Sequence, residues 1–230
     1  MSLSRRNFLR VLAAAPLGRA LARADPAAPP FGVTCALPES RAGFARALMG
    51  QATPLVMALP GAAGWDDAIE RHVRGGRLVI FESGAAFGDA RCFAEQRAGL
   101  RSAFGLTIDE PVRLWSENRP PYLDLVWPAP ARIRDFSFAI AVRGGEVVGR
   151  IGGLPVAALR PAGDGALLFL GSPVGPALGH ADPEARAWLA SVVDHPPTIA
   201  ARSRSAAGAI TRAAPAAHSA TTIAVNTSIV

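Results

Sequence analysis

Runs of apolar residues alternate with amphipathic segments along the first half of the chain, and this alternation predicts strands and helices in turn. Three runs, at residues 31–37, 54–59 and 77–81, are apolar on both faces, as expected of strands buried on both sides of a sheet. Between them, residues 39–49 and 65–74 repeat apolar side chains at the spacing of a helix face. With a further helix over 90–104, this order predicts a flavodoxin-like, doubly wound, mostly parallel α/β sheet.

The second half of the chain has a different pattern. Between residues 112 and 159 prolines become common, and two β-rich runs joined by Gly144-Gly145 predict a β-hairpin excursion that extends the sheet antiparallel. Residues 166–170 return to a buried strand, and Asp182 is a good N-cap for a last helix. Residues 195–230 carry no acidic or aromatic side chain and no periodicity, which predicts a disordered tail. One folded domain is therefore expected at residues 31–194.

Composition and charge narrow the possible partners. All 24 basic residues are arginines, and the formal net charge is +6. Eight of these arginines lie before residue 25 or after residue 200, whereas all 18 acidic residues lie between 25 and 194. Nucleic-acid binding needs basic side chains gathered on one face, so this distribution argues against a nucleic-acid partner. No apolar run approaches the ~20 residues of a membrane span, so no stable span is expected.

The first residues match a twin-arginine (Tat) export signal. The run Ser4 to Arg10 has the twin-arginine pattern, a short apolar stretch follows, and Ala22-Arg23-Ala24 offers the small residues that a signal peptidase needs. The alternative is an amphipathic first helix of the mature domain. The matching order of features favours a signal peptide over 1–24, cleavage after Ala24, and a linker over 25–30. This predicts a periplasmic or secreted protein with the Tat translocase as its partner during export. The motif residues are Arg5, Arg6, Phe8 and Leu9.

Two segments resemble the class I glutamine amidotransferase-like superfamily. Leu55 to Gly61 reads as a strand ending in Pro-Gly, and a helix then leads to a second strand over Gly75 to Gly84. The resemblance implies a fold of that superfamily, but the catalytic residues do not carry over. Glu82 stands where the family has its nucleophilic Cys, and the run Gly171 to Gly175 stands where its His is expected. The chain looks more like the non-catalytic relatives, such as accessory domains of large glycosidases and trehalose-utilisation-type proteins.

The leading functional hypothesis is an exported, non-catalytic ligand-binding or accessory domain, with an unknown small molecule or protein as its partner. Its expected ligand site lies at the end of the strand over 77–81 and in the Gly171 loop, where ligands bind in open α/β sheets. A turn with a solvated Glu82 and an ordinary loop at Gly171 are the simpler interpretations. The predicted ligand-binding residues are Glu82, Ser83, Gly84, Gly171 and Ser172.

Two alternatives stay open. The first is a periplasmic hydrolase that uses Glu82 with His180, with Ser83 as a further catalytic candidate. Ser83 is not part of a hydrolase elbow, because Phe81 stands where that motif needs Gly. The second is a subunit of a larger Tat-exported complex, which an exposed apolar patch would favour.

Other polar and aromatic residues suggest weaker possibilities. His180 and Asp182 are close in sequence, but Asp182 is explained as a helix cap, so no metal and no cofactor is expected. Cys35 and Cys92 would meet an oxidising compartment and could pair, although two buried free thiols are the favoured interpretation.

Three aromatic residues around the proline-rich excursion could form a binding platform or hold the loop to the body. These are Trp115, Tyr122 and Trp127.

Overall fold

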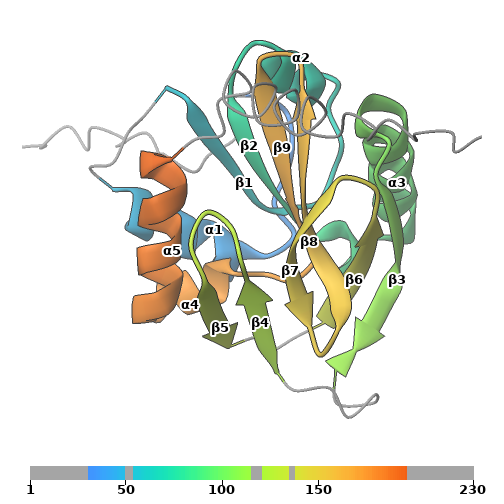
Figure 1. The fold of residues 1–230 in the computed structure, drawn as a ribbon. Coiled ribbons are helices and arrows are strands. Elements are labelled where there is room, and N and C mark those ends of the chain that lie inside the picture. The colour runs from blue at the N-terminus through green and yellow to red at the C-terminus, as the bar shows by residue number, and fades with distance from the viewer. Residues whose placement is uncertain (1–30, 50–53, 115–120, 135–137, 196–230) are drawn as a thin grey trace, which may run out of the picture.

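The structure, a computed structural model, describes residues 31–49, 54–114, 121–134 and 138–195 (Figure 1). The predicted signal peptide, linker and all but the first residue of the predicted tail lie outside the described residues. In the described part, no helix is both long and apolar enough to cross a membrane. The helices are α1 (Pro38–Leu48), α2 (Ala68–Arg74), the short 3-10 helix η1 (Ala85–Phe87), α3 (Ala90–Phe104), α4 (Gly175–Gly179) and α5 (Pro183–Asp194).

Seven strands form a mixed sheet in the order β1-β2-β9-β8-β7-β4-β5, and two more form a separate antiparallel pair, β3-β6. Within the large sheet only β1 with β2 and β2 with β9 are parallel, and every other pair is antiparallel. The strands are β1 (Val56–Ala62), β2 (Leu78–Ser83), β3 (Thr107–Arg113), β4 (Tyr122–Leu125), β5 (Ala131–Arg134), β6 (Phe138–Arg143), β7 (Glu146–Ile151), β8 (Leu154–Ala162) and β9 (Gly165–Leu170).

The prediction of a flavodoxin-like, mostly parallel sheet is therefore wrong. The chain makes one parallel crossover next to a sheet edge, from β1 through α2 to β2, and then departs from the doubly wound pattern. After α3 the strand β3 leaves the large sheet and pairs with β6. The connections β7-β8 and β8-β9 are two-residue turns, too short to carry a helix, so these neighbours must run antiparallel. The first turn is Gly152-Gly153, with φ of 51° and 86°, which suits a tight hairpin.

Two smaller predictions also differ from the structure. Residues 31–37 form no strand and contribute one isolated antiparallel bridge, between Cys35 and Ala62. The runs on either side of Gly144-Gly145 do form strands, β6 and β7, but these do not pair as a hairpin, because β6 pairs with β3 and β7 lies between β4 and β8. The helices predicted over 39–49, 65–74 and 90–104 are present as α1, α2 and α3, and Asp182 caps α5 by accepting a hydrogen bond from the Ala185 N–H.

The sheet separates two hydrophobic cores. One face packs against α1, α4 and α5, with Phe44, Ile80, Leu168 and Trp188 among its buried side chains. The other face packs against α2, α3 and the β3-β6 pair. Strands β2 and β9 are buried along their whole length because both of their faces are covered (Figure 1). The last residues of β2 therefore lie in the protein interior beside α4 and are not exposed to solvent.

Candidate functional site

Glu82, at the end of β2, is completely buried and holds three backbone segments together. One carboxylate oxygen accepts a hydrogen bond from the Gly61 N–H at 2.7 Å. The other accepts hydrogen bonds from the Val174 N–H at 2.6 Å and the Gly175 N–H at 3.0 Å. The loop after β9 thus does present N–H groups to an anion, but the anion is the protein's own carboxylate. The interpretation of Glu82 as a solvated turn residue is wrong, and its side chain joins β1, β2 and α4.

Burial raises the pKa of Glu82 above its ordinary value, because the ionised form loses its hydration. The three backbone N–H groups lower the pKa and so oppose that effect. The buried hydroxyl of Ser40, on α1, faces the carboxylate and also lowers its pKa, although its geometry falls short of a hydrogen bond. The carboxylate therefore sits where α1 and α4 approach the end of the sheet.

The other predicted ligand residues also serve the interior. Ser83 is buried, and its hydroxyl donates to the side chain of Gln96 at 2.7 Å. Ser172 is buried and donates to the Phe138 carbonyl at 3.3 Å. Gly84 and Gly171 are buried against backbone carbonyls, with which a Cβ at either position would collide. The structure thus brings the predicted residues close to one another, as internal contacts. Their role in ligand binding stays a prediction.

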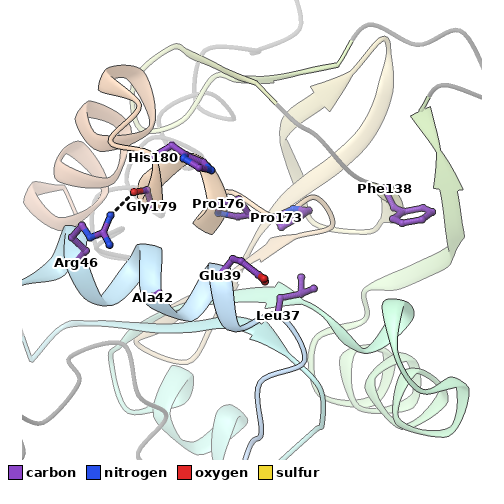
Figure 2. Close-up of a pocket in the computed structure, with 9 residues that line it drawn as sticks. All are labelled: Leu37, Glu39, Ala42, Arg46, Phe138, Pro173, Pro176, Gly179 and His180. Carbon is purple, nitrogen blue, oxygen red and sulfur yellow. Dashed lines mark hydrogen bonds between the residues drawn. The ribbon is translucent and has the colours of Figure 1, made fainter.

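An open cavity of about 470 Å³ lies beside this network, between α1 and α4 (Figure 2). Its volume is within the range of small-molecule sites, and most of its wall is apolar. Among the described lining residues three are ionisable, Glu39 and Arg46 from α1 and His180 at the end of α4. The apolar lining comes from Leu37, Ala42, Phe138, Pro173 and Pro176.

The two helices that form the cavity pack at very short range. A Cβ on Gly43 of α1 would collide with the carbonyl oxygen of Gly175, and one on Gly175 would collide with Ser40. Glu82 then fixes the start of α4 through the N–H groups of Val174 and Gly175. Because α4 and the preceding loop supply Pro173, Pro176 and His180, the buried carboxylate positions one wall of the cavity.

His180 lies in this cavity, and Glu82 is not among its lining residues. The predicted catalytic pairing of Glu82 with His180 therefore has no contact in the structure to support it. Sequence reasoning found His180 but missed Glu39 and Arg46, the ionisable residues on the facing helix. The sequence indicates these two residues only weakly. Their spacing with Ala42, at i, i+3 and i+7, places them on one helical face, but a face of this composition is typical of ordinary solvent-exposed helix surface.

The remaining candidates take structural roles. Within the described residues, no group of three or more potential metal ligands comes together. Cys35 and Cys92 are both free thiols. The Cys35 sulfur lies 3.1 Å from the carbonyl oxygens of both Leu37 and Pro60, which share its single S–H donor, and burial raises the pKa of the thiol.

Of the aromatic residues of the excursion, Trp127 packs against the body and Tyr122 packs on the neighbouring strand β5. The carbonyl of Trp127 accepts a hydrogen bond from the Trp188 indole at 3.0 Å, and the Trp127 side chain packs on the core. Tyr122 lies under the guanidinium of Arg132, with 4.6 Å between the guanidinium carbon and the ring centroid. Trp115 lies outside the described residues. The large apolar side chains exposed in the described part are Met49, Leu55 and Val126.

Comparison with known proteins gives no family. No family model matches the chain, and no curated protein matches it. Among solved structures, the β-galactosidase from Rahnella sp. R3 aligns at 14% identity and a TM-score of 0.47, covering 68% of this chain and 26% of that one. The β-galactosidase from Bacillus circulans sp. alkalophilus aligns at 16% identity and a TM-score of 0.44, covering 67% and 27%. The chain thus spans about a quarter of the length of these structures.

A third solved structure is similar to this chain at the same low level. The exo-β-1,4-mannosidase Op5Man5 from Opitutaceae bacterium strain TAV5 aligns at 15% identity and a TM-score of 0.44, covering 60% of this chain and 25% of that one. The mixed sheet corrects the flavodoxin-like fold that accompanied the amidotransferase-like prediction, whereas the relation to that superfamily stays a prediction. Alignments at this level assign neither a family nor an activity to this chain.

Proposed function

We propose that the protein binds a small, mainly apolar organic molecule in the cavity between α1 and α4. The observation that supports this function is the cavity itself, which is of ligand size and has mainly apolar walls with three ionisable side chains among the described lining residues. Its two helical walls are held at fixed spacing by the Gly43-Gly175 approach and by the buried Glu82 carboxylate. A rigid wall lowers the cost of ordering the site when a ligand binds.

The test is to fill the cavity without disturbing the core. Ala42 is exposed on α1 and lines the cavity, so Ala42→Phe places an aromatic ring in the ligand's space. Ala94→Phe on α3 is a matched control, because Ala94 is also an exposed helical residue and lies outside the cavity lining. We expect small apolar molecules to raise the melting temperature of the wild type and of Ala94→Phe but not of Ala42→Phe. Equal shifts in all three proteins would place binding elsewhere.

Hydrolysis in the same cavity is the second candidate, because Glu39 and His180 both line it. A carboxylate and an imidazole can act as general acid and base when a substrate lies between them. Glycoside hydrolysis usually needs two carboxylates, and Glu39 is the only carboxylate among the described lining residues. A hydrolase of this kind would lose turnover in both Glu39→Gln and His180→Gln while still binding ligand. Binding without turnover in the wild type would exclude it.

We also propose that the protein works outside the cytoplasm, on the strength of its twin-arginine motif. Replacing Arg5 and Arg6 together by Lys should leave the protein in the cytoplasm at its unprocessed mass, since the translocase reads the arginine pair. The wild type should be recovered from the periplasm with its N-terminus at Asp25. Export of the double variant at an unchanged level would contradict the proposal.

A further inference from the structure

The cavity has opposite charges at its two ends. Glu39 and Arg46 lie on the same face of α1, seven residues apart, so about 10 Å of helix separates them. Figure 2 shows them on different turns of the helix, with the apolar residue Ala42 between them. A ligand lying along α1 would meet a carboxylate at one end and a guanidinium at the other.

The positive end continues into a second groove. This groove, of about 260 Å³, lies between α1 and α5 and is lined by Arg46, Ala47, Arg186, Leu189 and Ala190. Arg46 lines both spaces and therefore connects them. Two arginines face the groove, and none of the described residues that line it is acidic. Glu184, in the first turn of α5, is already engaged by the backbone N–H of Arg132.

Arg46 is held in position before any ligand arrives. Its guanidinium donates to the carbonyl of Gly179, the last residue of α4, at 2.5 Å (Figure 2). A guanidinium has five N–H donors, so this bond leaves others for an anion. Arginine binds carboxylate and phosphate groups through paired hydrogen bonds, and a second guanidinium in the same groove strengthens such a site.

We infer that the ligand of the cavity is an organic monoanion, an inference that rests on the proposed binding function. Its apolar body lies against Leu37, Phe138 and Pro176, and its carboxylate group lies between Arg46 and Arg186. Glu39 at the far end repels a second negative charge and so selects against dianions. Medium-chain carboxylates have this chemistry.

Three probes of equal chain length test the inference by calorimetry on the exported protein. These are octanoate, neutral 1-octanol, and octanedioate, which carries a carboxylate at both ends. We expect octanoate to bind about tenfold more tightly than 1-octanol, because the charged head gains hydrogen bonds to arginine. Octanedioate should bind less tightly than octanoate, and Glu39→Gln should remove that difference.

Variants of the arginines locate the head group. Arg46→Gln and Arg186→Gln should each weaken octanoate binding about tenfold and leave 1-octanol unchanged. Arg71→Gln is the control, because Arg71 is exposed on α2, outside both spaces, and its loss changes the net charge equally.

The outcomes separate the two proposals. Equal affinity of the wild type for octanoate and 1-octanol would overturn the anion site while leaving the cavity as a binding site. A loss of 1-octanol binding as large as that of octanoate in both arginine variants would also overturn the head-group assignment. If none of the three probes binds, both proposals are overturned.

Discussion

Replacing Glu82 by Gln tests whether the buried carboxylate holds the end of β2 to α4. The amide keeps one oxygen, which can still accept from Val174 and Gly175, but it places an NH₂ group against the Gly61 N–H. Two buried donors are then without acceptors, at about 1–3 kcal/mol each. Removing a buried charge offsets part of this loss. We therefore expect the free energy of unfolding to fall by about 2–4 kcal/mol.

Urea unfolding of the purified protein measures this change. The variant should shift the midpoint urea concentration and leave the slope of unfolding free energy against urea concentration unchanged. Glu95→Gln is the matched control, because Glu95 is exposed on α3 and pairs with Arg91 in a surface salt bridge. That variant should stay within about 0.5 kcal/mol of the wild type. If Glu82→Gln lowered the free energy of unfolding by no more than the Glu95→Gln control, the carboxylate would not hold the site together. The proposed rigidity of the cavity wall would then be refuted.

The same variant gives a pH signature. Burial raises the pKa of Glu82 in the folded protein above its ordinary value of 4.5, so the folded state binds more protons than the unfolded state between those two pKa values. The contribution of Glu82 to stability is therefore fully present below about pH 4.5 and falls as the pH rises through the folded pKa. The difference in unfolding free energy between the wild type and Glu82→Gln should shrink as the pH rises. A difference that grew instead would mean that the hydrogen bonds outweigh burial and that the pKa is lowered.

Two further substitutions test the packing around the cavity and the excursion. Gly43→Ala should destabilise the protein by about 3 kcal/mol in the same urea assay, because its Cβ would collide with the Gly175 carbonyl, whereas Gly64→Ala, with open space around it, should change stability by less than about 0.5 kcal/mol. Trp188→Phe removes the hydrogen bond to the Trp127 carbonyl at 3.0 Å and should cost about 2 kcal/mol. A tolerated Gly43→Ala would show that α1 and α4 can move apart, and a neutral Trp188→Phe would show that water replaces the indole.

Much of the local structure is readable from the sequence. The helix periods of α1, α2 and α3, the Asp182 cap of α5 and the uninterrupted apolar runs of β2 and β9 are local signals, and the structure bears them out. Two-residue turns at Gly152-Gly153 and Gly163-Asp164 were equally local signals for antiparallel strands. As two-residue turns they predict that β7, β8 and β9 run antiparallel to their neighbours.

Other features depend on which strands become neighbours. The run at 31–37 has the composition of a strand, but it forms only one bridge, because the chain passes the edge of the sheet at Ala62 and enters α1. Strand β6 pairs with β3 outside the large sheet, and the sequence pattern does not predict this pairing. A period of two shows which side chains of a strand share a face, but it does not identify the partner strand.

The sequence by itself determined the helices, the buried strands and the position of Glu82 at a strand end. Only the tertiary structure decided that this carboxylate is buried among N–H groups from Gly61 and from the adjacent residues Val174 and Gly175, two segments that are far from each other along the chain. It also decided that Glu39, Arg46 and His180 share one cavity. The physical reason is that burial and charge proximity arise from the packing of α1 on α4, two helices that lie at opposite ends of the folded domain's sequence.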